Sequence, residues 1–167
     1  MPTILSTAFT LRAARPDDVP AILSMITELA EFEQLAHLVV ADAPLLHEAL
    51  FSAHPACECV LGIEAGAPVA FALFFHNFST FLGRRGLYLE DLYVKPAARR
   101  RGHAKAMLAH LAALAIARGC GRFEWSVLDW NTDAIGFYEG LGAVVMPDWR
   151  ICRVTGPALQ ALAAPQT

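Results

Sequence analysis

Residues 88–108 constrain this chain more than any other stretch, and they read YLEDLYVKPAARRRGHAKAML. The segment begins as an apolar strand, turns at Pro96, passes a basic run with one glycine, and continues as an alanine-rich helix. Such a strand, glycine turn and helix N-terminus can hold phosphate, because the free N–H groups of the first helical turn and the helix dipole both favour an anion. Gly102 would let this ligand approach the backbone without a Cβ in the way.

The length and composition indicate one folded domain. A chain of 167 residues is long enough to bury a core, so we expect a single domain over residues 1–167. Its residues are 56% hydrophobic and only 17% charged, which indicates apolar surface covered in a subunit interface, and we expect a homodimer. The net charge of −3 argues against general nucleic-acid binding.

Several classes of protein are disfavoured by what the sequence lacks. No apolar run reaches the roughly 18–20 residues that span a bilayer, and the N-terminus shows no signal-peptide pattern, so we expect no membrane partner. The cysteines do not have the paired spacing of a metal site, so we predict free thiols, no bound metal and a cytoplasmic setting. These cysteines are Cys57, Cys59, Cys120 and Cys152.

The hydrophobic periodicity predicts a mixed α/β architecture with helices on both faces of one sheet. Asp42 and Asn131 are predicted helix N-caps, and Gly66 lies in a predicted hairpin turn. We expect strands at 9–13, 57–64, 69–76, 87–94, 122–128, 143–146 and 150–155, a loop at 77–86, and helices at 16–33, 43–51, 102–118, 132–141 and 157–162.

Arg99, Gly102 and Ala104 form the spacing Arg-x-x-Gly-x-Ala, which resembles the acetyl-CoA signature of the GNAT acetyltransferases, usually written Gln/Arg-x-x-Gly-x-Gly/Ala. A second matching run, VLDWNTDAIGFYEGLGA, occupies residues 127–143. Together the two runs look like the diamine acetyltransferase family, and closer to its thialysine-acetylating branch. The resemblance extends from about residue 9 to residue 162. It implies the GNAT fold, with a mixed, mostly antiparallel sheet, and acetyl-CoA as the acetyl donor.

By this resemblance, residues 100–105 bind the pyrophosphate through main-chain N–H groups, and nearby arginines help with the other phosphate. A bulge in the family's central strand frees backbone groups that pair with the pantetheine arm, and a backbone N–H near Leu92 is the candidate oxyanion donor. From the residues alone, a solvated basic face before a helix is the alternative. The implied cofactor contacts are Leu92, Tyr93, Val94, Arg99, Arg100, Arg101, Gly102, His103, Ala104, Lys105, Asn131, Asp133, Ala134 and Tyr138.

The catalytic candidates are Glu90 and Tyr138. Glu90 and Asp91 are adjacent acids in an apolar strand, which indicates a wet cleft or an ion pair. By resemblance Glu90 is the base that takes the amine proton; it could instead only attract the ammonium group, or form an unrelated ion pair. Asn131, Ala134 and Tyr138 match the family's Asn-x-x-Ala-x-x-x-Tyr pattern, in which the tyrosine is the proposed general acid for the thiolate. Packing is the alternative for Tyr138.

The substrate side is less well defined. Phe32 and Glu33 match a pair that lines the family's amine site, although Glu33 could simply be a solvated helix end. Diamine-specific relatives carry an acidic Asp-Pro-Trp run where residues 79–81 here read Ser-Thr-Phe. We therefore expect a thialysine-like amino acid or a small amine as substrate, with polyamine acetylation, a protein lysine acceptor, a non-catalytic acyl-CoA sensor and a nucleic-acid module as alternatives. The expected substrate contacts are Phe32, Glu33, Glu90, Asp91, Trp125 and Ser126.

Overall fold

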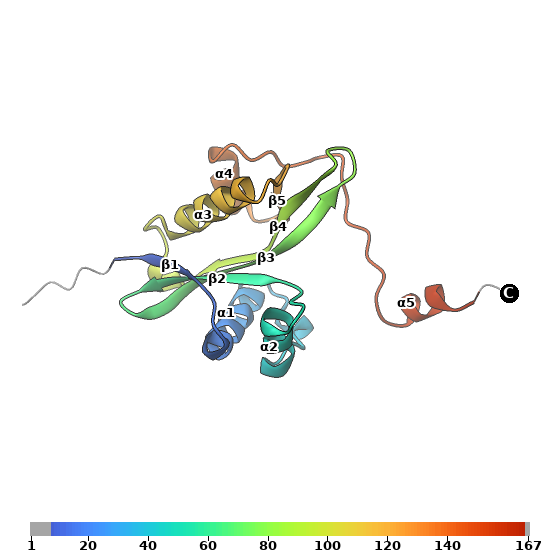
Figure 1. The fold of residues 1–167 in the computed structure, drawn as a ribbon, viewed down its shortest axis with the longest axis horizontal. Coiled ribbons are helices and arrows are strands. Elements are labelled where there is room, and N and C mark those ends of the chain that lie inside the picture. Colours follow the sequence, from blue (N-terminus) through green and yellow to red (C-terminus); the bar gives the residue numbers. More distant parts are fainter. Residues whose placement is uncertain (1–7, 166–167) are drawn as a thin grey trace, which may run out of the picture. The chain divides into compact units, whose positions relative to one another are not determined.

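The computed structural model describes residues 8–165, which form an α/β structure (Figure 1). By their internal contacts the residues fall into two compact units, Met1–Ser126 and Val127–Thr167. The first unit contains β1 (Thr10–Ala13), α1 (Val19–Phe32), α2 (Ala43–Phe51), β2 (Glu58–Glu64), β3 (Ala67–Ser79), β4 (Arg84–Val94), α3 (His103–Ala117) and β5 (Phe123–Trp125). The second contains α4 (Thr132–Gly140) and α5 (Gly156–Ala163).

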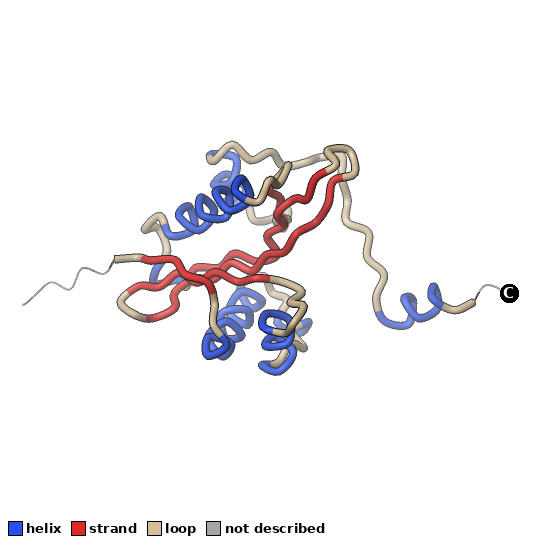
Figure 2. Tube along the Cα trace, viewed as in Figure 1, coloured by secondary structure: helices blue, strands red, loops and turns tan. Residues whose placement is uncertain are grey.

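The strands form one sheet in the order β1-β2-β3-β4-β5. Neighbours from β1 to β4 are antiparallel, and β4 and β5 are parallel, so the sheet is mixed and mostly antiparallel as expected. The long β3–β4 ribbon runs through the middle of the unit (Figure 2). Ala65 and Gly66 both have positive φ, which allows the tight turn that joins β2 to β3 at the predicted position.

A bulge interrupts β4 at Glu90. Leu73 of β3 pairs with Asp91, but its neighbour Phe74 pairs with Leu89, so Glu90 is the extra residue. Because side chains alternate between faces, the inserted residue changes which face each later residue of β4 occupies. Asp91 therefore shares a face with Leu73, and the bulge that the family resemblance implied is present.

Beyond this bulge, β4 has an open edge. Its parallel pairing with β5 runs only from Leu87 to Leu89. Residues 91–94 pair with β3 on the other side, and no described strand of the sheet pairs with their free side. The Val94 carbonyl accepts a hydrogen bond from Arg99 Nε at 2.8 Å, and the remaining outward backbone groups of this edge have no partner among the described strands, so they can pair with an extended ligand.

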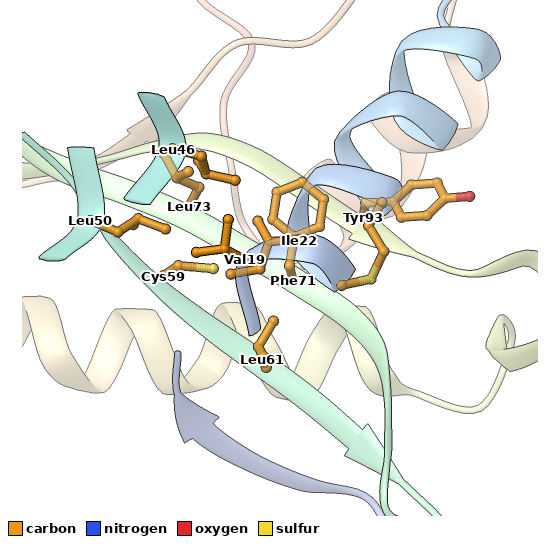
Figure 3. Packing of buried hydrophobic residues seen from close by; sticks show 10 residues of the cluster. Val19, Ile22, Leu46, Leu50, Cys59, Leu61, Phe71, Leu73 and Tyr93 are labelled. Carbon is orange, nitrogen blue, oxygen red and sulfur yellow. The ribbon is translucent and has the colours of Figure 1, made fainter. Parts of the chain in front are cut away.

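Helices cover both faces of the sheet in the first unit, with α1 and α2 on one face and α3 on the other (Figure 1). On the α1–α2 face Ile22, Phe71 and Tyr93 belong to one buried cluster (Figure 3). On the opposite face α3 buries Met107 and Leu111, and both are almost completely inaccessible to solvent. These two layers fix the position of β4 between them.

Three expectations about element bounds are wrong. The predicted loop at 77–86 continues as paired strands, with Asn77 opposite Gly86. The predicted strand at 122–128 shortens to β5. The strands predicted at 143–146 and 150–155 do not form, because in this single chain neither segment pairs with a strand edge, and the described backbone there is irregular.

Candidate active site

The turn before α3 has the geometry expected of an anion site. Gly102 is the N-cap residue with φ 83°, and Arg100 also lies in the left-handed region with φ 60°. The first helical bond runs from the N–H of Ala106 to the carbonyl of Gly102 at 2.9 Å, so the N–H groups of residues 103–105 precede the helical ladder. A Cβ built on Gly102 would meet no atom within 4 Å, so the space beside this backbone is open and a phosphate would fit there.

The basic side chains of this turn have unequal surroundings. Arg101 donates to Glu64 Oε1 at 2.8 Å and to the carbonyl of Ala97 at 2.9 Å, so its charge is already paired. The His103 ring is buried, stacks on Phe9 with centroids 3.8 Å apart, and places Nε2 3.6 Å from the same Glu64 oxygen. Arg100 and Lys105, which are both exposed, remain the side chains best placed to meet a phosphate from solvent.

Three carboxyl groups gather where the C-terminus of α1 meets β4. Glu90 is exposed at the bulge, Asp91 is half-buried, and Glu33 is the C-cap residue of α1. Burial, the charge of Glu90 and the charge of Glu33, in that order, raise the pKa of Asp91 to about 6. Burial also raises the pKa of Glu33. Because the negative charges of these neighbouring carboxylates repel one another, a bound cation would stabilise this cluster.

Arg99 and two aromatic rings lie on the same pair of elements. The Nε of Arg99 donates to the carbonyl of Val94 at 2.8 Å. Its guanidinium carbon is 5.3 Å from the ring centroid of Phe32 and 5.5 Å from that of Tyr93, both within the range of a cation–π contact. The side chain of Arg99 therefore turns toward the end of α1, where Phe32 was predicted to line the amine site.

Glu28 is a polar residue of this region that the sequence analysis missed. It accepts a hydrogen bond from the Tyr93 hydroxyl at 3.0 Å, and its other oxygen is 3.5 Å from Lys95 Nζ. The hydroxyl of Tyr93 points away from the core cluster (Figure 3). Glu28 precedes Phe32 by one helical turn, and this spacing was the signal that could have identified it.

Trp125 and Ser126 lie beside β4 on the other side of the bulge. Trp125 pairs in register with Leu89, and its ring contacts Phe123 with centroids 5.0 Å apart. The Ser126 hydroxyl is 2.8 Å from the hydroxyl of Tyr88. These two predicted acceptor-site residues thus lie next to the point where β4 and β5 separate.

The remaining predicted residues belong to the C-terminal unit. Asn131 caps α4 as expected, accepting from the N–H of Ala134 at 3.3 Å, and Asp133 follows in the first turn. Tyr138 lies near the end of α4, half-buried, with its ring centroid 5.4 Å from that of Phe137. Tyr138 and Asn131 are thus on one short helix, as the pattern requires.

Among residues 8–165, no helix is both long enough and apolar enough to cross a bilayer. Within the same range, no three His, Cys, Asp or Glu side chains form a group that could hold a metal ion.

Comparison with known proteins identifies the family. The pattern of the acetyltransferase (GNAT) family matches residues 23–143. The chain is 34% identical to L-ornithine N5-acetyltransferase of Arabidopsis thaliana (91% of this chain, 86% of the relative) and 35% identical to thialysine N-epsilon-acetyltransferase of Mus musculus (92% and 96%). A spermidine/spermine N(1)-acetyltransferase-like protein of Homo sapiens is 30% identical, over 81% of this chain and 20% of that protein.

The fold comparison agrees. An integron cassette protein of V. cholerae superposes with a TM-score of 0.79 at 24% identity, covering 94% of this chain and 98% of that one. Three observations indicate the same family: the glycine turn before α3, the open strand edge after a bulge, and the match over most of the chain. The chain belongs to the GNAT acetyltransferase family, and it is an N-acetyltransferase.

Proposed function

We propose that this enzyme transfers the acetyl group of acetyl-CoA to a primary amine of a small molecule, either a thialysine-like amino acid or a small amine. The observation that carries the proposal is the carboxyl cluster of Glu33, Glu90 and Asp91 beside the open edge of β4. An ammonium group is the natural ligand of such a cluster. Relatives at about 35% identity are named for ornithine and thialysine, both of which carry a side-chain amine.

The donor would bind along the first unit's free backbone groups. The N–H groups of residues 103–105 and the side chains of Arg100 and Lys105 would hold its phosphates. The open edge at residues 92–94 would pair with the pantetheine arm, and a backbone N–H near Leu92 would donate to the acetyl oxygen. By the family resemblance, Asn131 would contact the same arm.

The transfer would proceed by direct attack in a ternary complex. Asp91 and Glu33 would hold the ammonium, and Glu90 would take one of its protons, directly or through water. The neutral nitrogen would then bond to the acetyl carbonyl carbon, and the carbon–sulfur bond would break. Tyr138 would give its hydroxyl proton to the departing thiolate, which leaves as the free thiol, and the surplus proton of the acetylated nitrogen would pass through water to restore the Tyr138 hydroxyl. Placing donor and amine together accounts for most of the expected acceleration.

Polyamine acetylation is the second candidate, because the human relative carries spermidine and spermine in its name. The sequence at 79–81 weighs against it, since an acid expected in diamine-specific relatives is absent there. Ser79 stands where that acid is expected and is buried, while Phe81, which takes the place of the tryptophan, is almost completely exposed at the tip of the β3–β4 hairpin.

The test is release of free thiol from acetyl-CoA with thialysine, ornithine, lysine, spermidine, putrescine and a lysine peptide, in wild type and in a Tyr138→Phe variant. We expect turnover with the amino acids, and a loss of roughly 10²-fold or more in kcat for the variant with donor binding retained. Donor binding without turnover on any amine would favour a sensor. Absence of donor binding would overturn the assignment of the glycine turn.

We also propose that the enzyme is a homodimer and that residues 1–167 act as one acetyltransferase domain. The family match runs from residue 23 to residue 143 and therefore includes parts of both compact units. Apolar side chains of the segment 143–155 are exposed in the single chain, and a second copy would cover them. Cys59 is a free thiol in the core, the state that a reducing compartment preserves, and this supports a cytoplasmic location.

A further inference from the structure

We infer that Arg99 binds the α-carboxylate of an amino-acid substrate and is the residue that separates amino acids from diamines. The inference rests on the proposed function and deepens it, because it assigns a specificity-determining residue within the amine site. It gives Arg99 a role different from the phosphate contact that the family signature implies.

The position of Arg99 is fixed at three points. Its Nε bond to the Val94 carbonyl anchors the base of the guanidinium to β4. The Phe32 and Tyr93 rings lie 5.3 Å and 5.5 Å from the guanidinium carbon, one from α1 and one from β4. A planar group held in this way loses little further freedom when it binds a ligand, which favours recognition of a planar carboxylate.

The charge of Arg99 is not neutralised by an acid. Among the described residues Arg101 pairs with Glu64 and Lys95 pairs with Glu28, but no carboxylate lies within ion-pair distance of Arg99. Arg99 is also exposed. It is therefore a fixed, accessible cation, and the bidentate geometry of a guanidinium matches a carboxylate well.

The carboxyl cluster lies close to this cation along both elements. Glu33 directly follows Phe32 at the end of α1. Asp91 precedes Tyr93 by two residues on the same face of β4, a step of about 7 Å along a strand. Positive and negative groups thus lie a short distance apart at one site, with the acids arranged for an ammonium and Arg99 for an anion.

This charge pattern matches one class of substrate better than another. An amino acid with a side-chain amine carries a cation at one end and a carboxylate at the other, so each end meets an opposite charge. A diamine of the same length carries a second cation, which Arg99 would repel. The carboxylate contact is therefore both an attraction for amino acids and a barrier to diamines.

The experiment compares ornithine with putrescine, and lysine with cadaverine, since each pair differs only in the carboxylate. For Arg99→Gln we expect kcat/KM for the amino acids to fall by about tenfold or more, mainly through KM, while the diamines change by less than about threefold or improve. Arg99→Lys keeps the charge and should fall between wild type and Arg99→Gln. Titration calorimetry with acetyl-CoA should give a Kd within about twofold of wild type for both variants.

Arg100→Gln is the matched control, because Arg100 is the adjacent exposed arginine in the same turn. It should weaken acetyl-CoA binding without changing the ratio between amino acid and diamine. An equal loss of kcat/KM on both substrate types in Arg99→Gln would overturn the inference. So would weaker acetyl-CoA binding with unchanged selectivity, which would indicate that Arg99 contacts the phosphates of acetyl-CoA. If the wild type acetylates neither thialysine nor any of these four compounds, the proposed function itself fails, and the role of Arg99 fails with it.

Discussion

Asp91 shows how one inserted residue changes the surroundings of a carboxyl group in the proposed amine site. Without the bulge at Glu90, continuous alternation would have placed Asp91 on the same face as Leu87 and Leu89. The bulge turns it instead toward the α1–α2 face, where burial and two neighbouring acids raise its pKa to about 6. A carboxyl group that ionises near neutral pH makes binding of a cation depend on pH in the working range.

The first prediction concerns the pH dependence of substrate binding. Below pH 6 Asp91 becomes protonated and loses the charge that attracts the ammonium, so KM for the amine should rise as the pH falls through about 6. Steady-state kinetics from pH 5 to 8 would show this rise as an acid limb in the plot of KM against pH. A bound ammonium favours the ionised form, so kcat should show the limb at lower pH or not at all.

Glu33→Gln tests the origin of this limb. Removing the charge of Glu33 removes one of the causes that raise the pKa of Asp91, so the KM limb should move to lower pH. Glu31→Gln is the control, because Glu31 is an exposed acid on the same helix and does not contribute to that pKa. A limb that stays in place in Glu33→Gln would show that Asp91 is not the group being titrated.

The second prediction concerns stability. The folded protein raises the pKa of Asp91 from 3.8 to about 6, so it favours the protonated form. The stabilising effect of that proton is fully present below pH 3.8 and is lost as the pH rises through about 6. Asp91→Asn, which stays neutral, should therefore be more stable than wild type at pH 8 by up to about 3 kcal/mol, with the difference shrinking toward pH 4.

Chemical denaturation of both proteins at pH 4, 6 and 8 would measure this difference. Asp129→Asn, at an exposed position of the C-terminal unit, is the matched control and should show no such pH-dependent gain. A constant difference between Asp91→Asn and wild type across the range would mean that the substitution acts through packing and not through charge.

The strand–turn–helix unit of β4 and α3 would hold the donor in the proposed mechanism, and its glycine provides the third prediction. Gly102 has φ 83°, so Gly102→Ala should cost about 1–2 kcal/mol in stability from backbone strain. Its new Cβ would also stand in the space that is now open beside the turn, so acetyl-CoA should bind at least about tenfold more weakly.

Gly83→Ala separates these two effects. Gly83 also has positive φ, at 62°, and a Cβ there also meets no atom within 4 Å, but it lies in the β3–β4 hairpin. It should lose similar stability and keep its affinity for acetyl-CoA, as calorimetry and thermal unfolding would show. If both variants bind the donor like wild type, the turn before α3 does not hold its phosphates.

The elements that the sequence predicted well are those whose signals are local. The N-caps Asp42 and Asn131, the turn at Gly66 and the long apolar helix α3 all follow from residues within a few positions of one another. The bulge at Glu90 depends on the register between two strands, which alternation alone could not reveal. The contacts of Arg99 with Phe32 and Tyr93 likewise join residues distant in sequence.

The C-terminal strands that were predicted but do not form have a physical explanation. Residues 143–155 have the apolar content of strands, but a strand forms only when its backbone groups find a partner edge. In the single chain that partner is absent among the described strands, while Trp149 and Ile151 remain 74% and 71% exposed. Sequence patterns report which residues favour a strand, and they do not report which chain supplies its neighbour.

The fourth prediction follows from this segment. Burying a large apolar side chain contributes about 1.5–3 kcal/mol, so pairing the segments of two copies would stabilise a dimer substantially. Light scattering after size exclusion should give twice the chain mass for wild type and the single-chain mass for Trp149→Glu combined with Ile151→Glu. Ile116→Glu, at an 80% exposed position of α3, should remain dimeric. A monomeric wild type, or a double variant that stays dimeric, would show that a second copy does not cover this apolar segment.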